Sequence, residues 1–146
     1  MESIIVSIIC RLIIPFIQVY GLYIVLYGHL SPGGSFSGGS ILSSSLILYV
    51  LVFGLQRGKI LLEDETSHTV ETLGVVWFWL LGLFGILTGS YFLANRAGGF
   101  SIGTPGDLFS SGMILLITIG LGLKVASTLA SLFFKIAESE GDSHGD

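Results

Sequence analysis

Charged residues are scarce in this 146-residue chain, in which Asp, Glu, Lys and Arg together make up 11% of the sequence. Hydrophobic residues make up 51%, a balance that is too apolar for a water-soluble globular domain and typical of a protein within a bilayer. The six Lys and Arg residues are outnumbered by ten Asp and Glu residues and form no basic face. We therefore expect membrane lipid, and no nucleic acid, among the partners.

Cysteine is represented by Cys10 alone, which lies inside an apolar run, so neither a disulfide framework nor a cysteine metal cluster is expected. Carboxylates are also rare in the apolar stretches, where Glu71 comes nearest to the membrane interior. The sequence contains no nucleophile triad, no paired carboxylates and no ligand set for haem, iron–sulfur clusters or flavin. We expect no catalytic residues, no metal site and no cofactor in this chain, so the sequence does not predict an enzyme.

A short motif rich in glycine occurs twice, 73 positions apart, and seven of the eleven positions from 32 to 42 are identical in the second copy. The identical residues are Pro32, Gly33, Phe36, Ser37, Gly39, Ile41 and Leu42, which match Pro105, Gly106, Phe109, Ser110, Gly112, Ile114 and Leu115. We interpret the motif as a duplicated turn that leads into a hydrophobic helix. The structural turns are expected at Pro32, Gly33, Gly34, Pro105, Gly106 and Asp107.

Four segments are long and apolar enough to cross about 30 Å of hydrocarbon, which requires roughly 20 residues. They cover approximately residues 3–27, 36–55, 70–93 and 109–134. We therefore expect an all-α integral membrane protein in which the four transmembrane helices form two repeated helical hairpins. One domain would cover residues 1–134, followed by a polar tail over 135–146.

The basic residues predict how these spans are oriented. An even number of spans places both termini on the same side, and Arg11, Arg57, Lys59 and Lys135 share that side, against Arg96 on the other. The positive-inside rule therefore predicts that both termini face the cytoplasm of a cell whose membrane holds the chain.

Lys124 is the most informative residue of the fourth span because it lies near the middle of an apolar stretch. A lysine at this depth costs about 2.5–3.5 kcal/mol on insertion scales, so its surroundings must stabilise it. Small and hydroxyl-bearing residues share its helix face, namely Gly120, Ser127, Thr128 and Ser131. Two interpretations stay open: an ion pair that holds this helix to another subunit, or a member of a proton or cation pathway.

Arg11 and His29 are further candidates for an ion path. Arg11 either extends its guanidinium to the cytoplasmic interface or faces the acidic or carbonyl groups of a partner subunit. His29, in the first turn, either handles protons or is an interfacial histidine satisfied by neighbouring carbonyls. Asp107, beside the second turn, is expected to cap the N-terminus of the fourth helix.

Three motifs together resemble the B subunit, MrpB or MnhB, of the multisubunit Mrp-type sodium/proton antiporters. The motifs are Gly28-His29-Leu30-Ser31-Pro32-Gly33-Gly34 with Phe36 and Gly38-Gly39, then Gly103-Thr104-Pro105-Gly106-Asp107-Leu108-Phe109-Ser110-Ser111-Gly112, and Gly120-Leu121-Gly122-Leu123-Lys124-Val125. The resemblance covers nearly the whole chain. Ser35 and Ser37 depart from the family pattern, which usually has glycine and glutamine at these positions, but both changes keep the positions small or polar.

This resemblance implies a small, non-catalytic, four-span subunit that supports cation/proton translocation and assembly among other Mrp-type antiporter subunits. Similar B-type subunits occur in archaeal membrane-bound hydrogenases and sulfane sulfur reductases, where the partners include hydrogenase or sulfur-reductase subunits. Both the stand-alone and the respiratory setting stay open. So do two other functions: a purely structural assembly subunit, and a homo-oligomeric ion channel in which Lys124 rings a pore.

Overall fold

The computed structural model describes residues 4–30, 33–61, 64–89, 91–95, 99, 103–104, 106–107 and 110–143, and all of their side chains except those of 59–61, 64–66 and 140–143. Within these residues the chain forms five helices and no strand: α1 (Ile4–Tyr27), α2 (Ser35–Phe53), α3 (Leu55–Leu61), α4 (Asp64–Leu87) and α5 (Met113–Ser143). Four of these helices, all but α3, are long and apolar enough to cross a membrane. The predicted all-α membrane fold is confirmed.

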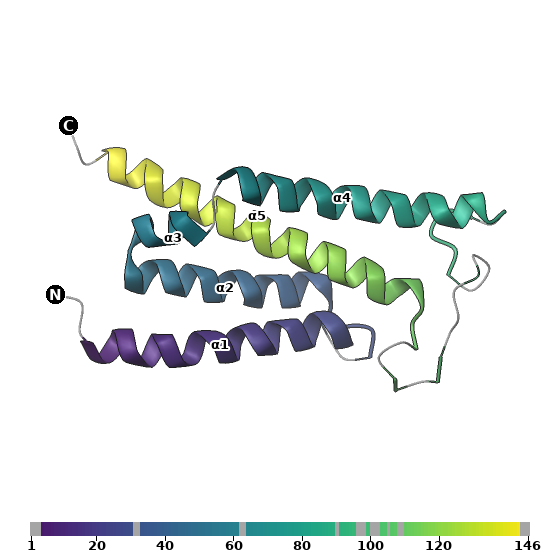
Figure 1. The fold of residues 1–146 in the computed structure, drawn as a ribbon, viewed down its shortest axis with the longest axis horizontal. Helices are drawn as coiled ribbons and strands as arrows, with labels where there is room; N and C mark the ends of the chain where they lie inside the picture. Colours follow the sequence, from purple (N-terminus) through teal and green to yellow (C-terminus); the bar gives the residue numbers. More distant parts are fainter. Residues whose placement is uncertain are drawn as a thin grey trace.

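The four long helices lie side by side in the order α1, α2, α5 and α4 (Figure 1). α1 packs against α2 and α4 packs against α5, so each pair forms an antiparallel hairpin, and the two hairpins meet where α2 packs against α5. We call the end of the bundle that holds Ile4 and Ser143 the terminal end, and the end that holds Tyr27 and Met113 the turn end.

Two adjacent glycines let α2 pack tightly against both of its neighbours. A Cβ at Gly38 would lie 2.4 Å from Cγ2 of Val25 in α1, and a Cβ at Gly39 would lie 2.6 Å from the carbonyl oxygen of Gly122 in α5. Successive helix residues point in directions about 100° apart, so neighbouring glycines can serve two different interfaces. Small residues at such positions allow the close backbone approach that membrane helices use for packing.

The third span differs from its predicted range of 70–93, because α4 runs from Asp64 to Leu87. It begins earlier because the polar residues 64–69 form the first turns of the same helix, before its apolar part. It ends earlier because the chain turns at Gly89, where φ is 80°. Phe92 then folds back on α4, with its ring edge-on to that of Phe78 at 6.4 Å between centroids. The apolar residues 91–93 therefore pack beside the helix instead of extending it.

The remaining helix ends also differ from the predicted ranges. α2 ends at Phe53 because Gly54, with φ at 91°, reverses the chain, and residues 55–61 then form α3, a short helix that the sequence did not predict. α5 begins at Met113 rather than at residue 109, because the preceding residues 110–112 form a turn. α5 also continues to Ser143, so most of the predicted polar tail is helical, as its Lys, Ala and Glu residues favour.

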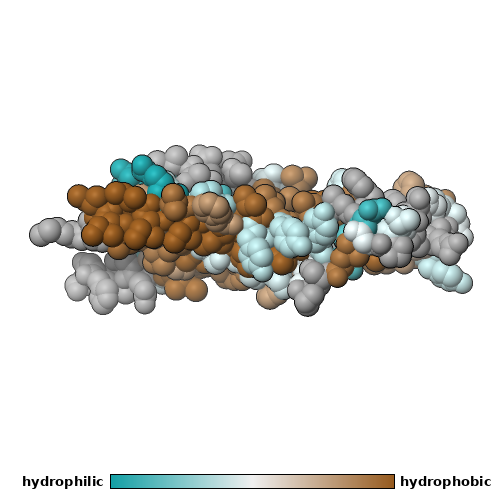
Figure 2. Space-filling view, turned by 90° about the horizontal axis from the view of Figure 1, so that it is seen from below, coloured by the Kyte–Doolittle hydropathy of each residue, from teal (hydrophilic) through white to brown (hydrophobic). Residues whose placement is uncertain are grey.

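α1 lies at the edge of the bundle and exposes a large hydrophobic surface. Figure 2 views the molecule from the side of α1 and shows this surface as most continuous toward the terminal end. The exposed side chains there include Ile4, Ile5, Ile8, Leu12 and Phe16. Surfaces of this kind mark contact with a membrane or another protein.

Candidate functional site

Lys124 lies in α5 at the interface with α4. Counted from Met113, it is about 16 Å along the helix, near the middle of a hydrocarbon layer about 30 Å thick. Its side chain is half-buried, and a Cβ at Gly74 of α4 would lie only 2.6 Å from its own Cβ. Because Gly74 has no side chain, the aliphatic part of the Lys124 side chain fits between the two helices.

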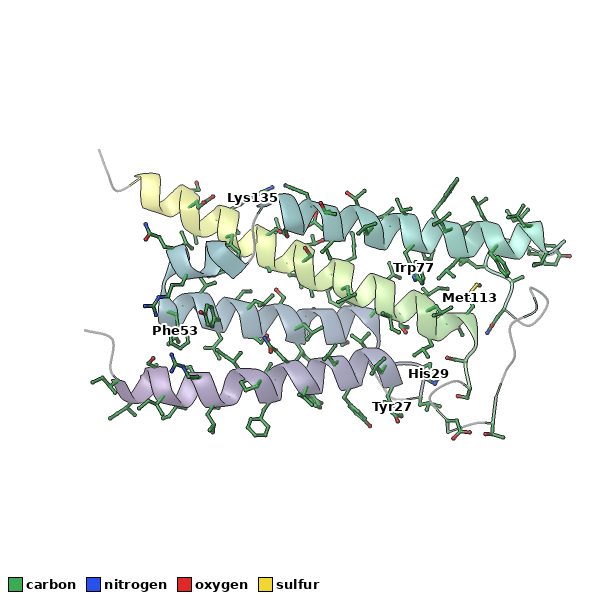
Figure 3. All side chains as sticks on the ribbon, viewed as in Figure 1. Tyr27, His29, Phe53, Trp77, Met113 and Lys135 are labelled. Atoms are coloured by element: carbon green, nitrogen blue, oxygen red, sulfur yellow. The ribbon has the colours of Figure 1, made fainter. Side chains whose placement is uncertain are left out.

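Trp77 fixes the same helix crossing one turn away, between α4 and α5 (Figure 3). Its indole Nε1 donates a hydrogen bond to the carbonyl oxygen of Leu116 at 3.0 Å. A Cβ at Gly120 would lie 2.5 Å from Cδ1 of the indole, so the ring occupies the space that this glycine leaves open. The position of α4 along α5 is therefore set by steric fit and by a directional bond.

Three serines form a hydrogen-bonded cluster about one turn from Lys124 toward the terminal end. Ser67 Oγ of α4 lies 2.7 Å from Ser127 Oγ of α5 and also bonds to Ser131 Oγ. Ser67 and Ser127 are only 4% and 6% exposed. Ser127 and Ser131 were expected on the lysine face, whereas Ser67 precedes the predicted third span, 70–93, and its contact with α5 was not predicted.

The Lys124 ammonium has no partner of opposite charge among the side chains that the structure describes. Glu71 instead lies 3.8 Å from Nδ1 of His68, one turn along α4. The backbone carbonyl of Lys124 accepts a hydrogen bond from the Thr128 hydroxyl at 2.9 Å. Lys124 is thus a half-buried amine beside a hydroxyl cluster, without a described counter-ion.

An apolar groove of about 380 Å³ runs along α4 and α5 beside this lysine. Its lining residues are Val70, Leu73, Gly74, Val76, Trp77, Leu80, Ile119, Gly120 and Leu123. Leu123 precedes Lys124 in the chain and Gly74 touches its stem, so the groove borders the same helix crossing.

His29 connects the two repeated turns at the turn end of the bundle, where Figure 3 labels it. Its Nε2 lies 3.3 Å from Oγ of Ser110 in the second turn. Its Nδ1 is buried without a hydrogen-bond partner among the described residues, and so is Oγ of the neighbouring Ser111. The structure therefore brings together two motifs that are 73 residues apart, a contact that the sequence did not predict.

The first turn is tight: a Cβ at Gly28 would lie 2.5 Å from Cα of Gly34. In the second turn Gly106 has φ at 108°, a region that favours glycine. Of the predicted turn residues, Pro32 and Pro105 lie outside the described residues, whereas Gly33, Gly34, Gly106 and Asp107 lie in non-helical backbone.

Asp107 does not cap the fourth long helix, which corrects the prediction. The helix begins six residues later, at Met113, and Asp107 accepts a hydrogen bond from the Thr104 hydroxyl instead. Asn95 provides the cap, because its Oδ1 accepts the backbone N–H of Met113 at 3.0 Å and its Nδ2 donates to the carbonyl oxygen of Ser111 at 2.9 Å. A cap from a distant loop has no local sequence pattern.

Arg11 lies toward the terminal end, where its guanidinium carbon is 5.7 Å from the ring centroid of Phe53 in α2. It is about 24 Å along α1 from Tyr27, which closes the helix at the turn end beside His29. The structure therefore does not bring the three candidate ion-path residues together: Arg11 is near one end, Lys124 is near mid-depth and His29 is at the other end.

Among the described residues, no three His, Cys, Asp or Glu side chains lie close enough to hold a metal ion. Cys10 is a free, half-buried thiol. The polar groups of the described part of the chain are mainly hydroxyls, accompanied by a few basic side chains and carboxylates. Hydroxyls of this kind can exchange hydrogen bonds between packed helices.

Comparison with protein families gives a match over residues 5–131 to the domain related to the MnhB subunit of Na+/H+ antiporters. The chain is 29% identical over 120 residues to the B subunit of the Na+/H+ antiporter of Bacillus subtilis, covering 77% of this chain and 82% of that one. It is 33% identical over 120 residues to an uncharacterised protein of Methanocaldococcus jannaschii, covering 80% of this chain but 45% of that protein.

Among solved structures, the fold is similar to a chain of the membrane-bound sulfane sulfur reductase, an archaeal respiratory membrane complex. The TM-score is 0.77 at 31% sequence identity, and the match covers 92% of this chain and 57% of that one. The chain thus spans about half the length of two of these relatives and most of the length of the Bacillus protein.

Proposed function

Because the chain belongs to the family of domains related to the MnhB subunit of Na+/H+ antiporters, we propose that it is a small, non-catalytic membrane subunit of an Mrp-type sodium/proton antiporter module. The observation that carries this proposal is the family match over residues 5–131, which covers nearly all of the four candidate spans. In this role the chain supports cation/proton translocation and the assembly of the module, in a cell membrane with both termini in the cytoplasm.

Its partners in this proposal are other Mrp-type antiporter subunits. The similarity to the Bacillus subtilis protein supports a stand-alone antiporter, whereas the similarity to the sulfane sulfur reductase chain supports a respiratory complex with hydrogenase or sulfur-reductase subunits. The same role is proposed in both settings, because a module that moves cations and protons can be driven by an ion gradient or by electron transfer.

Within this subunit, we assign Lys124 to the ion route. An amine at mid-depth costs about 2.5–3.5 kcal/mol, and ionisable residues at this depth are by default candidates for ion and proton pathways. The Ser67, Ser127 and Ser131 hydroxyls continue from the lysine toward the terminal end and can exchange hydrogen bonds along that line. The acidic partner of the amine is then a residue of a neighbouring subunit.

His29 is the second candidate on the route, at the opposite end. In this proposal the imidazole handles protons at the turn end, where its Nε2 contacts Ser110 and its buried Nδ1 has no described hydrogen-bond partner. Arg11 lies far from both residues, toward the terminal end of α1, so we do not place it on this route.

The Lys124→Ala variant tests the assignment when it is measured in the assembled complex. We expect sodium-dependent proton exchange per assembled complex to fall about tenfold or more, as befits the loss of a proton- or charge-handling group. Lys135→Ala is the matched control, because Lys135 is an exposed lysine on the same helix at the terminal end (Figure 3). It should leave exchange unchanged.

The same experiment separates the second candidate function, a purely structural assembly subunit. The apolar groove along α4 and α5 favours that alternative, because it offers a surface on which a partner helix can pack. If Lys124→Ala lowers the yield of the complex but leaves exchange per complex unchanged, the lysine only holds a neighbour. If both yield and exchange are normal, Lys124 has no part in the mechanism.

A further inference from the structure

Arg11 and Arg57 line one recess of about 200 Å³ at the terminal end of the bundle, together with Ile14, Tyr49 and Phe53. Arg11 and Ile14 come from α1, Tyr49 and Phe53 from α2, and Arg57 from α3. Figure 3 shows Phe53 at the terminal end of α2, beside α1. Two arginines from helices that are distant in the sequence therefore line the same small recess, whose other lining residues are an isoleucine and two aromatic residues.

The fold brings the two arginines together through two glycines. Gly54, with φ at 91°, reverses the chain after α2, so that α3 turns back toward the bundle. Gly58 then packs closely against α2 and α5, since a Cβ there would lie 2.5 Å from Cγ2 of Val50 and 2.9 Å from the ring of Phe134. This contact fixes α3 and holds Arg57 at the recess.

The recess carries two like charges that the described part of the chain does not neutralise. No described carboxylate pairs with Arg11 or Arg57, and both side chains are exposed. Arg11 lies over the ring of Phe53, which orients the planar guanidinium and leaves its N–H edge free. A rigid fork of donors of this kind matches the oxygens of a phosphate group, to which it can bond bidentately.

The depth of Arg11 in the membrane indicates that this phosphate belongs to a lipid headgroup. Tyr27 lies at the other end of α1 and is typical of the headgroup level. A hydrocarbon layer spanned by about 20 residues then places the opposite interface near residue 7, about one turn from Arg11. A long arginine side chain reaches that interface from this depth.

We propose that this recess binds the phosphate of an anionic phospholipid in the leaflet at the terminal end. The guanidinium groups of Arg11 and Arg57 hold the phosphate oxygens, and Ile14, Tyr49 and Phe53 contact the glycerol and the upper acyl chain. The exposed hydrophobic residues of α1 on the acyl-chain side of that interface, which include Leu12 and Phe16, would lie against the same acyl chains. This proposal does not depend on ion translocation by the chain.

The test uses the full chain in detergent, freed of bound lipid, and measures the binding of dioleoyl phosphatidylglycerol by native mass spectrometry. Arg11→Gln and Arg57→Gln each remove one guanidinium, whereas Lys135→Gln removes one positive charge at the same end of the bundle without belonging to the recess. We expect each arginine variant to bind the lipid about tenfold more weakly and the lysine variant to change binding less than about twofold.

Arg11→Lys keeps the positive charge but loses the planar set of N–H donors. Its affinity for the lipid should therefore lie between those of the wild type and Arg11→Gln. Circular dichroism checks that each variant keeps its helices, and the Arg11→Lys variant replaces Arg11→Gln if the latter does not fold. Equal affinity in the wild type and all arginine variants would overturn the proposal. Displacement of the lipid by an equal concentration of inorganic phosphate would also overturn it, because the recess would then take the free anion.

A crosslinking experiment uses the assembled complex and a phosphatidylglycerol that carries a photoactivatable headgroup. Crosslinks to the peptides that hold Arg11 or Arg57 support the lipid site. If those peptides stay unlabelled and Arg11→Gln instead releases a neighbouring subunit, the recess binds a partner's carboxylate and the lipid assignment is wrong.

Discussion

Replacing Gly39 with Ala should loosen the junction between the two hairpins, because Gly39 is where α2 packs on α5. The added Cβ would lie 2.6 Å from the carbonyl oxygen of Gly122, and 2.8 Å from Cβ of Val125. The nearest atom belongs to the backbone of α5, so no change of rotamer can relieve the contact. To reach an ordinary contact distance of 3.4 Å, the two helices must separate by about 0.8 Å.

Overpacking of this kind costs about 1–3 kcal/mol. In a chain of this size, each kcal/mol lowers the unfolding temperature by about 3–4 °C, so the midpoint of Gly39→Ala should fall by about 3–12 °C. Thermal unfolding in one detergent, followed by the fluorescence of Trp77 and Trp79 in α4, measures this shift. Both tryptophans belong to the second hairpin, with Trp77 at the contact between α4 and α5, and they report on the unfolding of that hairpin.

Gly82→Ala is the matched control, because it makes the same substitution inside another long helix. Its added Cβ would lie even closer to a neighbour, at 2.1 Å, but the three nearest atoms belong to the ring of Phe92. That ring lies in the turn after α4 and is 46% exposed, so it can move aside. We expect a cost below about 1 kcal/mol.

Two results would refute this reasoning. One is a Gly82→Ala variant that is destabilised as much as Gly39→Ala, which would mean that the size of the overlap matters more than the rigidity of the atom it meets. The other is rescue of Gly39→Ala by Val125→Ala, since that change removes only the Cγ atoms and leaves the overlaps with the Gly122 carbonyl oxygen and with Cβ of residue 125 in place.

Two further substitutions test the cap and the hydroxyl cluster. Asn95→Ala should destabilise the start of α5 by about 0.5–2 kcal/mol and speed hydrogen exchange of the Met113 amide, whereas Asn95→Asp, which keeps the acceptor, should cost less. Ser67→Ala should lower stability by about 0.6–1.7 kcal/mol in the fluorescence assay, because it removes bonds between α4 and α5. Ser44→Ala is its control, since that exposed hydroxyl bonds only within α2; equal effects would contradict an interhelical role for Ser67.

The membrane fold could be predicted from the sequence because it depends on long apolar runs, which need no knowledge of tertiary contacts. The resemblance to the MrpB or MnhB subunit is confirmed by the family match, and it depended on the two Pro-Gly turns and the motif around Lys124. The repeat also indicated two hairpins, and α1 with α2 and α4 with α5 form such pairs.

The details that the sequence did not predict depend on contacts between distant residues. α4 ends before the turn at Gly89, after which Phe92 packs back on the helix although its hydropathy favours continuation. The start of α5 is set by Asn95, which lies 18 residues before the amide that it caps. Ser67 lies among polar residues before the predicted third span, 70–93, but a helix can leave the hydrocarbon without ending, and α4 includes this serine. The recess between Arg11 and Arg57 exists only because α3 folds back.

The most direct test of the proposed function compares the complex that copurifies with this chain and the chain alone, each reconstituted in liposomes with a pH-sensitive dye inside. We expect the copurified complex to contain other antiporter subunits and to exchange protons for sodium. We expect the chain alone to show neither sodium/proton exchange nor ion conduction. Ion conduction or sodium/proton exchange by the chain alone would contradict the proposed function and favour a homo-oligomeric channel.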